Sequence, residues 1–245
     1  MPAMRHRFFS QSPIVSERAW LEDAEAHHFT HVLRGRVGEE LVLFDGSGTE
    51  FTARVVRIGR AVVDLVVLSQ QWVDRELSFP LTLGVALPKG ERQQWLVEKA
   101  VELGVTRLVP LMTSRGVAQP VEQALARLRR TVIEASKQSG RNRLMLIAPP
   151  QSLAEYVSEV PAAARRWLAH PASRSSAGGV VPTSQVPWEA DATYLAVGPE
   201  GGLADEEVSL VRAAGWQVID LGPRTLRVET AAIALASLLV LRVTG

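Results

Sequence analysis

The stretch Leu221-Gly-Pro-Arg-Thr-Leu-Arg-Val-Glu-Thr-Ala-Ala232 decides how the second half of this chain folds. It joins a short apolar segment to a long one, and a second glycine-rich turn, Val197-Gly-Pro-Glu-Gly-Gly202, precedes it in a similar setting. Glycine lets a backbone approach a ligand closely, because no Cβ intervenes. Each turn also leads into a helix N-terminus, where free N–H groups favour polar acceptors or negative charge. The two turns therefore predict one ligand site built from two loops.

The bulk composition is that of an ordinary soluble globular protein. The chain has 245 residues, 47% of them hydrophobic and 22% charged, which excludes a disordered chain and allows one large domain or two small ones. The absence of cysteine excludes disulfides, cysteine-bound zinc and a cysteine nucleophile, and it suits a cytoplasmic protein. No signal peptide is expected, and the longest apolar run, Ala231–Leu241, is too short to cross a membrane.

Residues 1–72 predict a small β-barrel domain. Glu40–Asp45, Phe51–Ile58 and Ala61–Leu68 read as short strands with glycine turns between them, and Glu22–Leu33 predicts one helix before them. The histidines of that helix have no acidic or cysteine partners at ligand spacing, so no metal site is expected.

Residues 78–245 show a different pattern, in which strands alternate with helices. The predicted strands are 81–87, 107–111, 144–147, 166–170, 193–197 and 216–221. The predicted helices are 91–103, 121–139, 153–157, 203–214 and 228–242. This alternation is typical of an α/β domain with a mainly parallel sheet covered by helices on both faces.

Two arginines stand where the helix dipole disfavours cations. Arg224 and Arg227 flank the predicted N-terminus of the last helix, and Glu229 and Thr230 fall in its first turn. Local rules broken in this way often mark function. The alternative is a simple ion pair between Arg227 and Glu229.

Basic residues are concentrated between Thr113 and Arg143. This segment holds seven basic and two acidic residues, although the formal net charge of the whole chain is only +1. Such a cluster predicts either a surface that faces phosphates or an ordinary solvated helix face.

Together these segments resemble one known family, the bacterial 16S rRNA (uridine-N3) methyltransferases of the RsmE type, within the SPOUT superfamily. The resemblance extends over nearly the whole chain, and its most specific motifs are Gly198–Gly202 and Leu221–Ala231. Its other motifs are 5–9, 28–34, 43–48, 98–104 and 134–141. One departure is visible, because Val228 stands where the family usually has threonine.

The resemblance implies a PUA-like RNA-binding domain followed by a SPOUT domain with a deep C-terminal trefoil knot, an exception to the rule against knots. It also implies a cytoplasmic homodimer that binds S-adenosylmethionine in the knot, and no metal. The implied cofactor-binding residues are Leu168, His170, Val197, Gly198, Pro199, Glu200, Gly201, Gly202, Leu221, Gly222, Arg224, Leu226, Thr230 and Ala231.

The implied reaction is methylation of N3 of one uridine in 16S rRNA of the 30S subunit. Arg227 or Arg224 is expected to stabilise negative charge on the uracil oxygens, and Glu229 or Glu200 to accept the N3 proton. The residues expected to contact RNA phosphates are Arg5, Arg7, Arg34, Arg115, Lys137 and Arg141.

Three other functions compete with this interpretation. A SPOUT methyltransferase that acts on another RNA or position would have much the same site. A non-catalytic RNA-binding assembly factor would have no need of the glycine loops. A nucleotide-binding oxidoreductase fits the α/β alternation but not the absence of the dinucleotide fingerprint.

Overall fold

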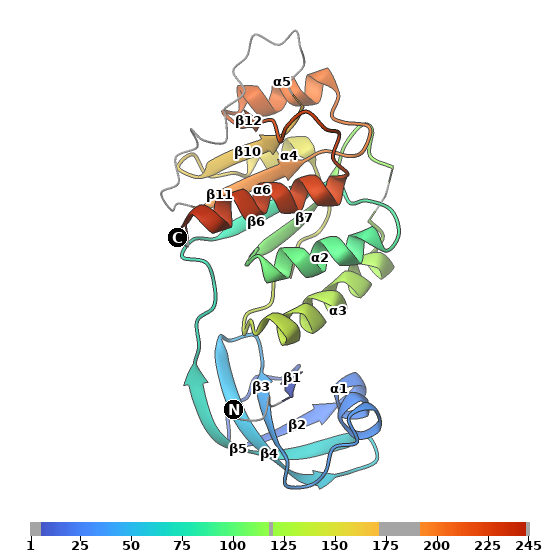
Figure 1. Ribbon diagram of the computed structural model, residues 1–245, viewed down its shortest axis with the longest axis vertical. Helices are drawn as coiled ribbons and strands as arrows, with labels where there is room; N and C mark the ends of the chain where they lie inside the picture. The colour runs from blue at the N-terminus through green and yellow to red at the C-terminus, as the bar shows by residue number, and fades with distance from the viewer. Residues whose placement is uncertain (1–5, 118–119, 172–191, 244–245) are drawn as a thin grey trace. The chain divides into compact units, whose positions relative to one another are not determined.

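The computed structural model describes residues 6–117, 120–171 and 192–243. It comprises two compact units (Figure 1). The first unit contains residues 1–76 together with 136–144, and the second contains residues 77–135 together with 145–245. The predicted domain limits, 1–72 and 78–245, did not anticipate that a segment from the middle of the chain belongs to the first unit.

The first unit is built on a curled five-stranded sheet with the order β1-β3-β4-β5-β2. β1 pairs with β3 in parallel, and the other pairs are antiparallel. Its elements are β1 (Arg7–Phe9), β2 (Arg18–Glu22), α1 (Asp23–His27), the π-helical turn η1 (His28–Val32), β3 (Glu40–Phe44), β4 (Thr49–Ile58) and β5 (Val62–Trp72). The predicted single helix is thus an α-helical turn continued by a π-helical one, and β1 and β2 escaped prediction.

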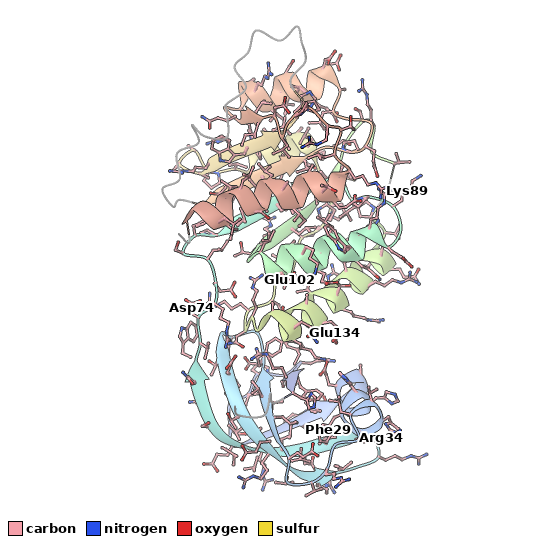
Figure 2. All side chains as sticks on the ribbon, viewed as in Figure 1. Phe29, Arg34, Asp74, Lys89, Glu102 and Glu134 are labelled. Carbon is pink, nitrogen blue, oxygen red and sulfur yellow. The ribbon has the colours of Figure 1, made fainter. Side chains whose placement is uncertain are left out.

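Alternation of side chains along the strands makes the core of this unit. Phe51, Ala53 and Val55 on β4 are buried, as are Val63 and Leu65 on β5. The helical segment closes the core by burying Ala26 and Phe29, the latter labelled in Figure 2.

The second unit has a parallel sheet with the order β12-β10-β11-β6-β7-β8, and β9 pairs with β7 off this path. Its strands are β6 (Leu81–Val85), β7 (Arg107–Met112), β8 (Leu146–Ile147), β9 (Gln151–Ser152), β10 (Arg165–Ala169), β11 (Thr193–Val197) and β12 (Gln217–Ile219). Its helices are α2 (Arg92–Glu102), α3 (Glu122–Ser139), α4 (Leu153–Ser158), α5 (Asp205–Ala213) and α6 (Val228–Val243). The last turn of α3 belongs to the first unit.

Helices pack against this sheet in two pairs (Figure 1). α6 packs against α2 and against β6, β10 and β11, and α4 packs against α5 and β7. The α4–α5 side is close-packed, because a Cβ on Gly84 would lie 2.6 Å from the Tyr156 ring, whose hydroxyl donates to the Leu195 carbonyl. The predicted α/β architecture with a covered parallel sheet is confirmed. Within the described ranges, no helix is long and apolar enough to cross a membrane.

Candidate functional site

Three neighbouring strands have their C-terminal ends at one place. β10, β11 and β12 run parallel, with β10 in the middle, so the segments that follow them emerge at the same edge of the sheet. Ligands of open α/β sheets characteristically bind at this edge. We call the space between these segments the loop cavity. It is lined by Ala169, His170, Pro171, Val197, Gly198, Pro199, Glu200, Gly202, Leu203, Asp220, Leu221, Gly222, Arg224, Thr225, Leu226, Val228 and Ala231.

Glycines allow these loops to turn tightly around the cavity. Gly202 has φ +71° and Gly222 has φ +108°, a region that other L-residues rarely adopt. The Gly202 N–H donates to the Pro199 carbonyl at 2.8 Å, and the Gly222 N–H donates to Asp220 Oδ1 at 2.9 Å. At Gly198 a Cβ would lie 2.9 Å from Leu203 Cγ, so a larger residue has no room there.

Most of the predicted cofactor-binding residues line the loop cavity, and three do not. Leu168 is fully buried in the core between the sheet and α4–α5. Gly201 is exposed and accepts a hydrogen bond at its carbonyl from Arg115. Thr230 lines a neighbouring groove.

Six residues that complete the cavity were not among the predicted cofactor-binding residues: Ala169, Pro171, Leu203, Asp220, Thr225 and Val228. Most of them are adjacent in sequence to predicted residues, and this adjacency is the feature by which they could have been found. Val228 is buried, and its apolar side chain adds to the cavity wall at the position where the resembled family has threonine.

His170 is the titratable ring of the cavity. Burial lowers the pKa of His170, and the nearby positive charge of Arg212 lowers it further, whereas Asp205 and Asp220 oppose the shift. The imidazole is therefore neutral at pH 7, and a bound ligand meets a polar but uncharged ring.

The loop after β7 braces the glycine loop that follows β11. Arg115 Nη1 donates to the carbonyls of Gly201 at 3.2 Å and Leu203 at 3.4 Å. The Glu207 carboxylate accepts from the backbone N–H groups of Ser114 and Ala204, both at 2.8 Å. Burial opposes ionisation of Glu207, but these hydrogen bonds outweigh it and lower its pKa. Arg115, predicted to contact RNA, is thus engaged in holding this loop.

A second concave surface lies beside the loop cavity. We call it the α2–α6 groove, and it is lined by Glu91, Arg92, Trp95, Arg227, Glu229 and Thr230. Of the four predicted catalytic residues, Glu200 and Arg224 line the loop cavity, and Arg227 and Glu229 line this groove.

Arg92 links the two surfaces. Its Nη2 lies 3.2 Å from Glu200 Oε1, and its Nη1 lies 3.6 Å from Glu229 Oε2. Sequence reasoning missed both Arg92 and Trp95, although a cation and a large aromatic in the first turns of α2 were the available signal. They are far from Glu229 in sequence, and only the packing of α2 on α6 brings them together.

Three residues predicted to contact RNA have side chains engaged in intramolecular pairs. Lys137 is buried with its Nζ 2.9 Å from Glu25 Oε1, and Arg141 is buried with its Nε 3.0 Å from Glu76 Oε1. Arg7 pairs with Glu50 and donates to Asn142 Oδ1 at 2.7 Å. These guanidinium and ammonium groups hold residues 136–144 within the first unit.

Two residues predicted to contact RNA remain, Arg34 and Arg5. Arg34, labelled in Figure 2, is exposed and has φ +55°. Arg5 lies outside the described residues.

Comparison with known proteins gives a consistent result along the chain. Residues 75–240 match the RNA methyltransferase domain family, and residues 21–68 match the RNA methyltransferase PUA domain family. The chain is 33% identical over 229 residues to ribosomal RNA small subunit methyltransferase E of a Synechocystis species, covering 92% of this chain and 74% of that protein. It is 32% identical over 238 residues to the protein of the same name in Mycobacterium bovis, with 94% and 88% covered.

Solved structures agree with these sequence matches. Ribosomal RNA small subunit methyltransferase E from Neisseria gonorrhoeae, bound to S-adenosyl methionine, is 30% identical with a TM-score of 0.85, and 96% of each chain is covered. A putative methyltransferase from Legionella pneumophila, in complex with bound SAM, is 31% identical with a TM-score of 0.89, and 98% of each chain is covered.

Proposed function

Because this chain belongs to the RNA methyltransferase family, we propose that it transfers a methyl group from S-adenosylmethionine to N3 of one uridine in 16S rRNA. The observation that supports this most is the pairing of two surfaces. A glycine-lined loop cavity at the strand ends adjoins a groove that holds a buried carboxylate.

The loop cavity suits S-adenosylmethionine by the chemistry of its lining. Backbone groups of the glycine turns and apolar side chains such as Leu226 and Val228 fit an adenine ring and a ribose, and the polar groups of His170 and Arg224 fit the amino-acid end. When bound there, S-adenosylmethionine supplies an electrophilic methyl group on a sulfonium.

The protein must make uracil N3 nucleophilic. N3 carries a proton, and its electron pair becomes available when the N3–H bond breaks and the pair stays on nitrogen. Glu229 or Glu200 accepts that proton, directly or through water. Arg227 or Arg224 donates to the uracil oxygens, on which the negative charge is spread. Holding the base in line with the methyl group contributes about 7–11 kcal/mol of barrier reduction.

RNA binding is assigned to the first unit and to the basic face of α3. Arg34 on the first unit and Arg127 and Arg130 on α3 are exposed, unlike Lys137 and Arg141. Phosphate contacts by such residues release counterions, so binding weakens steeply with salt.

This assignment predicts the salt dependence of the enzyme. Between 50 and 200 mM KCl, the affinity for 30S subunits is expected to fall by about tenfold or more for each two to three phosphate contacts. Binding of S-adenosylhomocysteine is expected to change little, and filter binding and calorimetry measure the two. Arg34→Ala should lower the salt slope by about one. A slope equal to that of the wild type would remove Arg34 from the RNA-binding surface.

Three further properties follow from the resemblance and are part of the proposal: a cytoplasmic location, a C-terminal trefoil knot and a homodimer. The outer face of α6 supports the homodimer. Together with residues 220–222, it forms an apolar surface that includes Ala234 and Leu238, as well as Leu241, which is 70% exposed. Sedimentation equilibrium tests the dimer, and an exclusively monomeric protein at micromolar concentration would refute it.

The deciding experiment uses labelled S-adenosylmethionine, the purified protein and 30S subunits from cells that lack the matching gene. The product is mapped by primer extension and nucleoside mass spectrometry. A single N3-methyluridine in 16S rRNA supports the proposal. A methyl group on another RNA or position, or no transfer despite tight cofactor binding, favours the other SPOUT activities or the assembly role.

A further inference from the structure

The α2–α6 groove contains residues that the proposed chemistry does not yet use. Glu229 and Arg227 were expected to act on the uracil, but Arg92 and Trp95 come from a helix that the sequence did not associate with the site. Both side chains line the groove beside the loop cavity, where they are positioned to contact a bound group.

The first turn of α6 separates the groove from the loop cavity. Val228 and Ala231, three residues apart, line the cavity, whereas Arg227 and Thr230, also three apart, line the groove. Residues three apart share a face of a helix, so two faces of one helical turn form walls of two adjacent spaces. The two spaces adjoin, because Arg92 of the groove has its Nη2 3.2 Å from Glu200 Oε1 of the cavity.

The groove combines the guanidinium groups of Arg92 and Arg227 with the carboxylates of Glu91 and Glu229 and the hydroxyl of Thr230. Glu229 is only 6% exposed, and its Oε2 has no hydrogen-bond partner among the described residues. Arg92 is close by, with its Nη1 3.6 Å from that oxygen, and Arg227 supplies a second cation. A buried carboxylate oxygen without a hydrogen bond is costly, which indicates that a donor completes it when a ligand binds.

Trp95 gives the groove an aromatic surface. Its side chain is 44% exposed, although it stands on a helix whose inner face is buried through Leu96, Val97, Ala100 and Val101. Aromatic side chains that line nucleic-acid sites stack on bases, because every base has a π-face.

From these contacts, and resting on the proposed function, we propose that the α2–α6 groove is the subsite for the flipped target base. Trp95 stacks on the uracil ring, Glu229 accepts the N3–H, and Arg92 and Arg227 donate to the flanking carbonyl oxygens. The Watson–Crick edge of uracil is acceptor, donor, acceptor, which complements this arrangement. Cytosine offers an acceptor at N3, so the carboxylate repels it and the groove selects uracil.

A cross-link tests this subsite without turnover. 30S subunits are reconstituted with 16S rRNA that carries 5-bromouridine at the mapped position, mixed with protein and S-adenosylhomocysteine, irradiated and analysed by mass spectrometry. The proposal requires a cross-link at Trp95 and its loss in Trp95→Ala. Cross-links confined to residues outside the α2–α6 groove overturn it.

Kinetics supply the second readout, with Gln94→Ala as the matched control, because Gln94 is an exposed neighbour on the same helix that does not line the groove. Trp95→Ala is expected to lower kcat/KM for subunits by about tenfold to a hundredfold, which corresponds to the loss of about 1–3 kcal/mol of base stacking. Trp95→Phe should stay within about threefold of the wild type. All variants should bind S-adenosylhomocysteine equally, because Trp95 does not line the loop cavity.

The outcomes separate this subsite from the proposed function. If Trp95→Ala behaves like Gln94→Ala, the groove does not hold the base, although the enzyme still methylates uridine. If the wild type binds S-adenosylhomocysteine but methylates no subunit, the proposed function itself fails. In that case no position is mapped, so 16S rRNA substituted throughout with 5-bromouridine is used instead, and a cross-link at Trp95 would still identify the groove as a base-binding site.

Discussion

Arg227 stands directly before α6, at the end of the helix where the dipole disfavours a cation. The structure leaves this side chain exposed and places it in the groove with Arg92 and Glu229. A simple pair between Arg227 and Glu229 was the alternative, but Glu229 forms an ion pair with Arg92. Arg227 is therefore available to a negatively charged transition state.

Replacement of Arg227 tests that role. Arg227→Ala is expected to lower kcat by about a hundredfold to a thousandfold, the usual effect of removing a donor to developing negative charge. Arg227→Lys keeps the charge but loses the planar fork, so an intermediate rate is expected. Single-turnover methylation of 30S subunits measures both. Near-native turnover of Arg227→Ala with the normal product would show that this arginine has no catalytic role.

His170 makes the stability of the protein depend on pH. Burial, assisted by the charge of Arg212, lowers the pKa of His170 in the folded state, so the unfolded chain takes up a proton first as the pH falls. The neutral His170 ring therefore contributes its full share of folding stability above the unfolded pKa of about 6.5, and this share is lost as the pH falls through and below that value. When the pH is lowered from 7.5 to 5.5, the Tm of the wild type should fall further than the Tm of His170→Gln. Equal losses in thermal scans would show that His170 titrates normally.

At the scale of elements, the glycine turns fix the loops that make the cavity. Gly202 and Gly215 provide a matched pair, because they have φ +71° and φ +78° and neither has an atom within 4 Å of an added Cβ. Only Gly202 lines the loop cavity. The two positions therefore separate backbone strain from cofactor binding.

Alanine at both positions is expected to lower stability by a similar amount, about 1–3 kcal/mol, because each forces a residue with a Cβ into a sparsely populated region. Gly202→Ala should in addition weaken S-adenosylhomocysteine binding, whereas Gly215→Ala should not. Urea denaturation and calorimetry measure these effects. Equal affinities of the two variants would mean that the turn at Gly202 does not shape the cofactor site.

At the scale of the whole molecule, buried ion pairs join parts of the chain that are far apart in sequence. Lys137 pairs with Glu25 and also lies 5.6 Å from the centroid of the Phe8 ring, and Arg141 pairs with Glu76. These contacts explain why residues 136–144 belong to the first unit, although the chain before and after them belongs to the second.

Removal of one partner of such a pair leaves an uncompensated buried charge. Lys137→Ala is expected to lower the free energy of unfolding by about 3–5 kcal/mol. Lys99→Ala is the control, because its pairs with Glu98 and Glu102 lie on a more exposed helix face, where such pairs contribute little to stability. Urea denaturation followed by circular dichroism measures both. Similar losses for the two variants would contradict a structural role for Lys137.

The sequence by itself determined the local structure, the α/β class and the glycine loops that line the loop cavity. Side-chain periodicity and glycine conformation depend on near neighbours, so they can be read from the chain. It missed β1 and β2, which are short edge strands paired with distant partners. The buried ion pairs of Lys137 and Arg141 also escaped the sequence, because a charged residue looks solvated until its partner is known.

Only the tertiary structure decided which residues meet. Strand order brings three loops to one edge of the sheet, and the packing of α2 on α6 sets Arg92 and Trp95 beside Glu229. These contacts depend on burial and on the pairing of charges across long sequence separations, and neither leaves a periodic signal in the chain. The loops of the cavity are thus visible in the sequence, whereas the α2–α6 groove beside them is formed only in the folded protein.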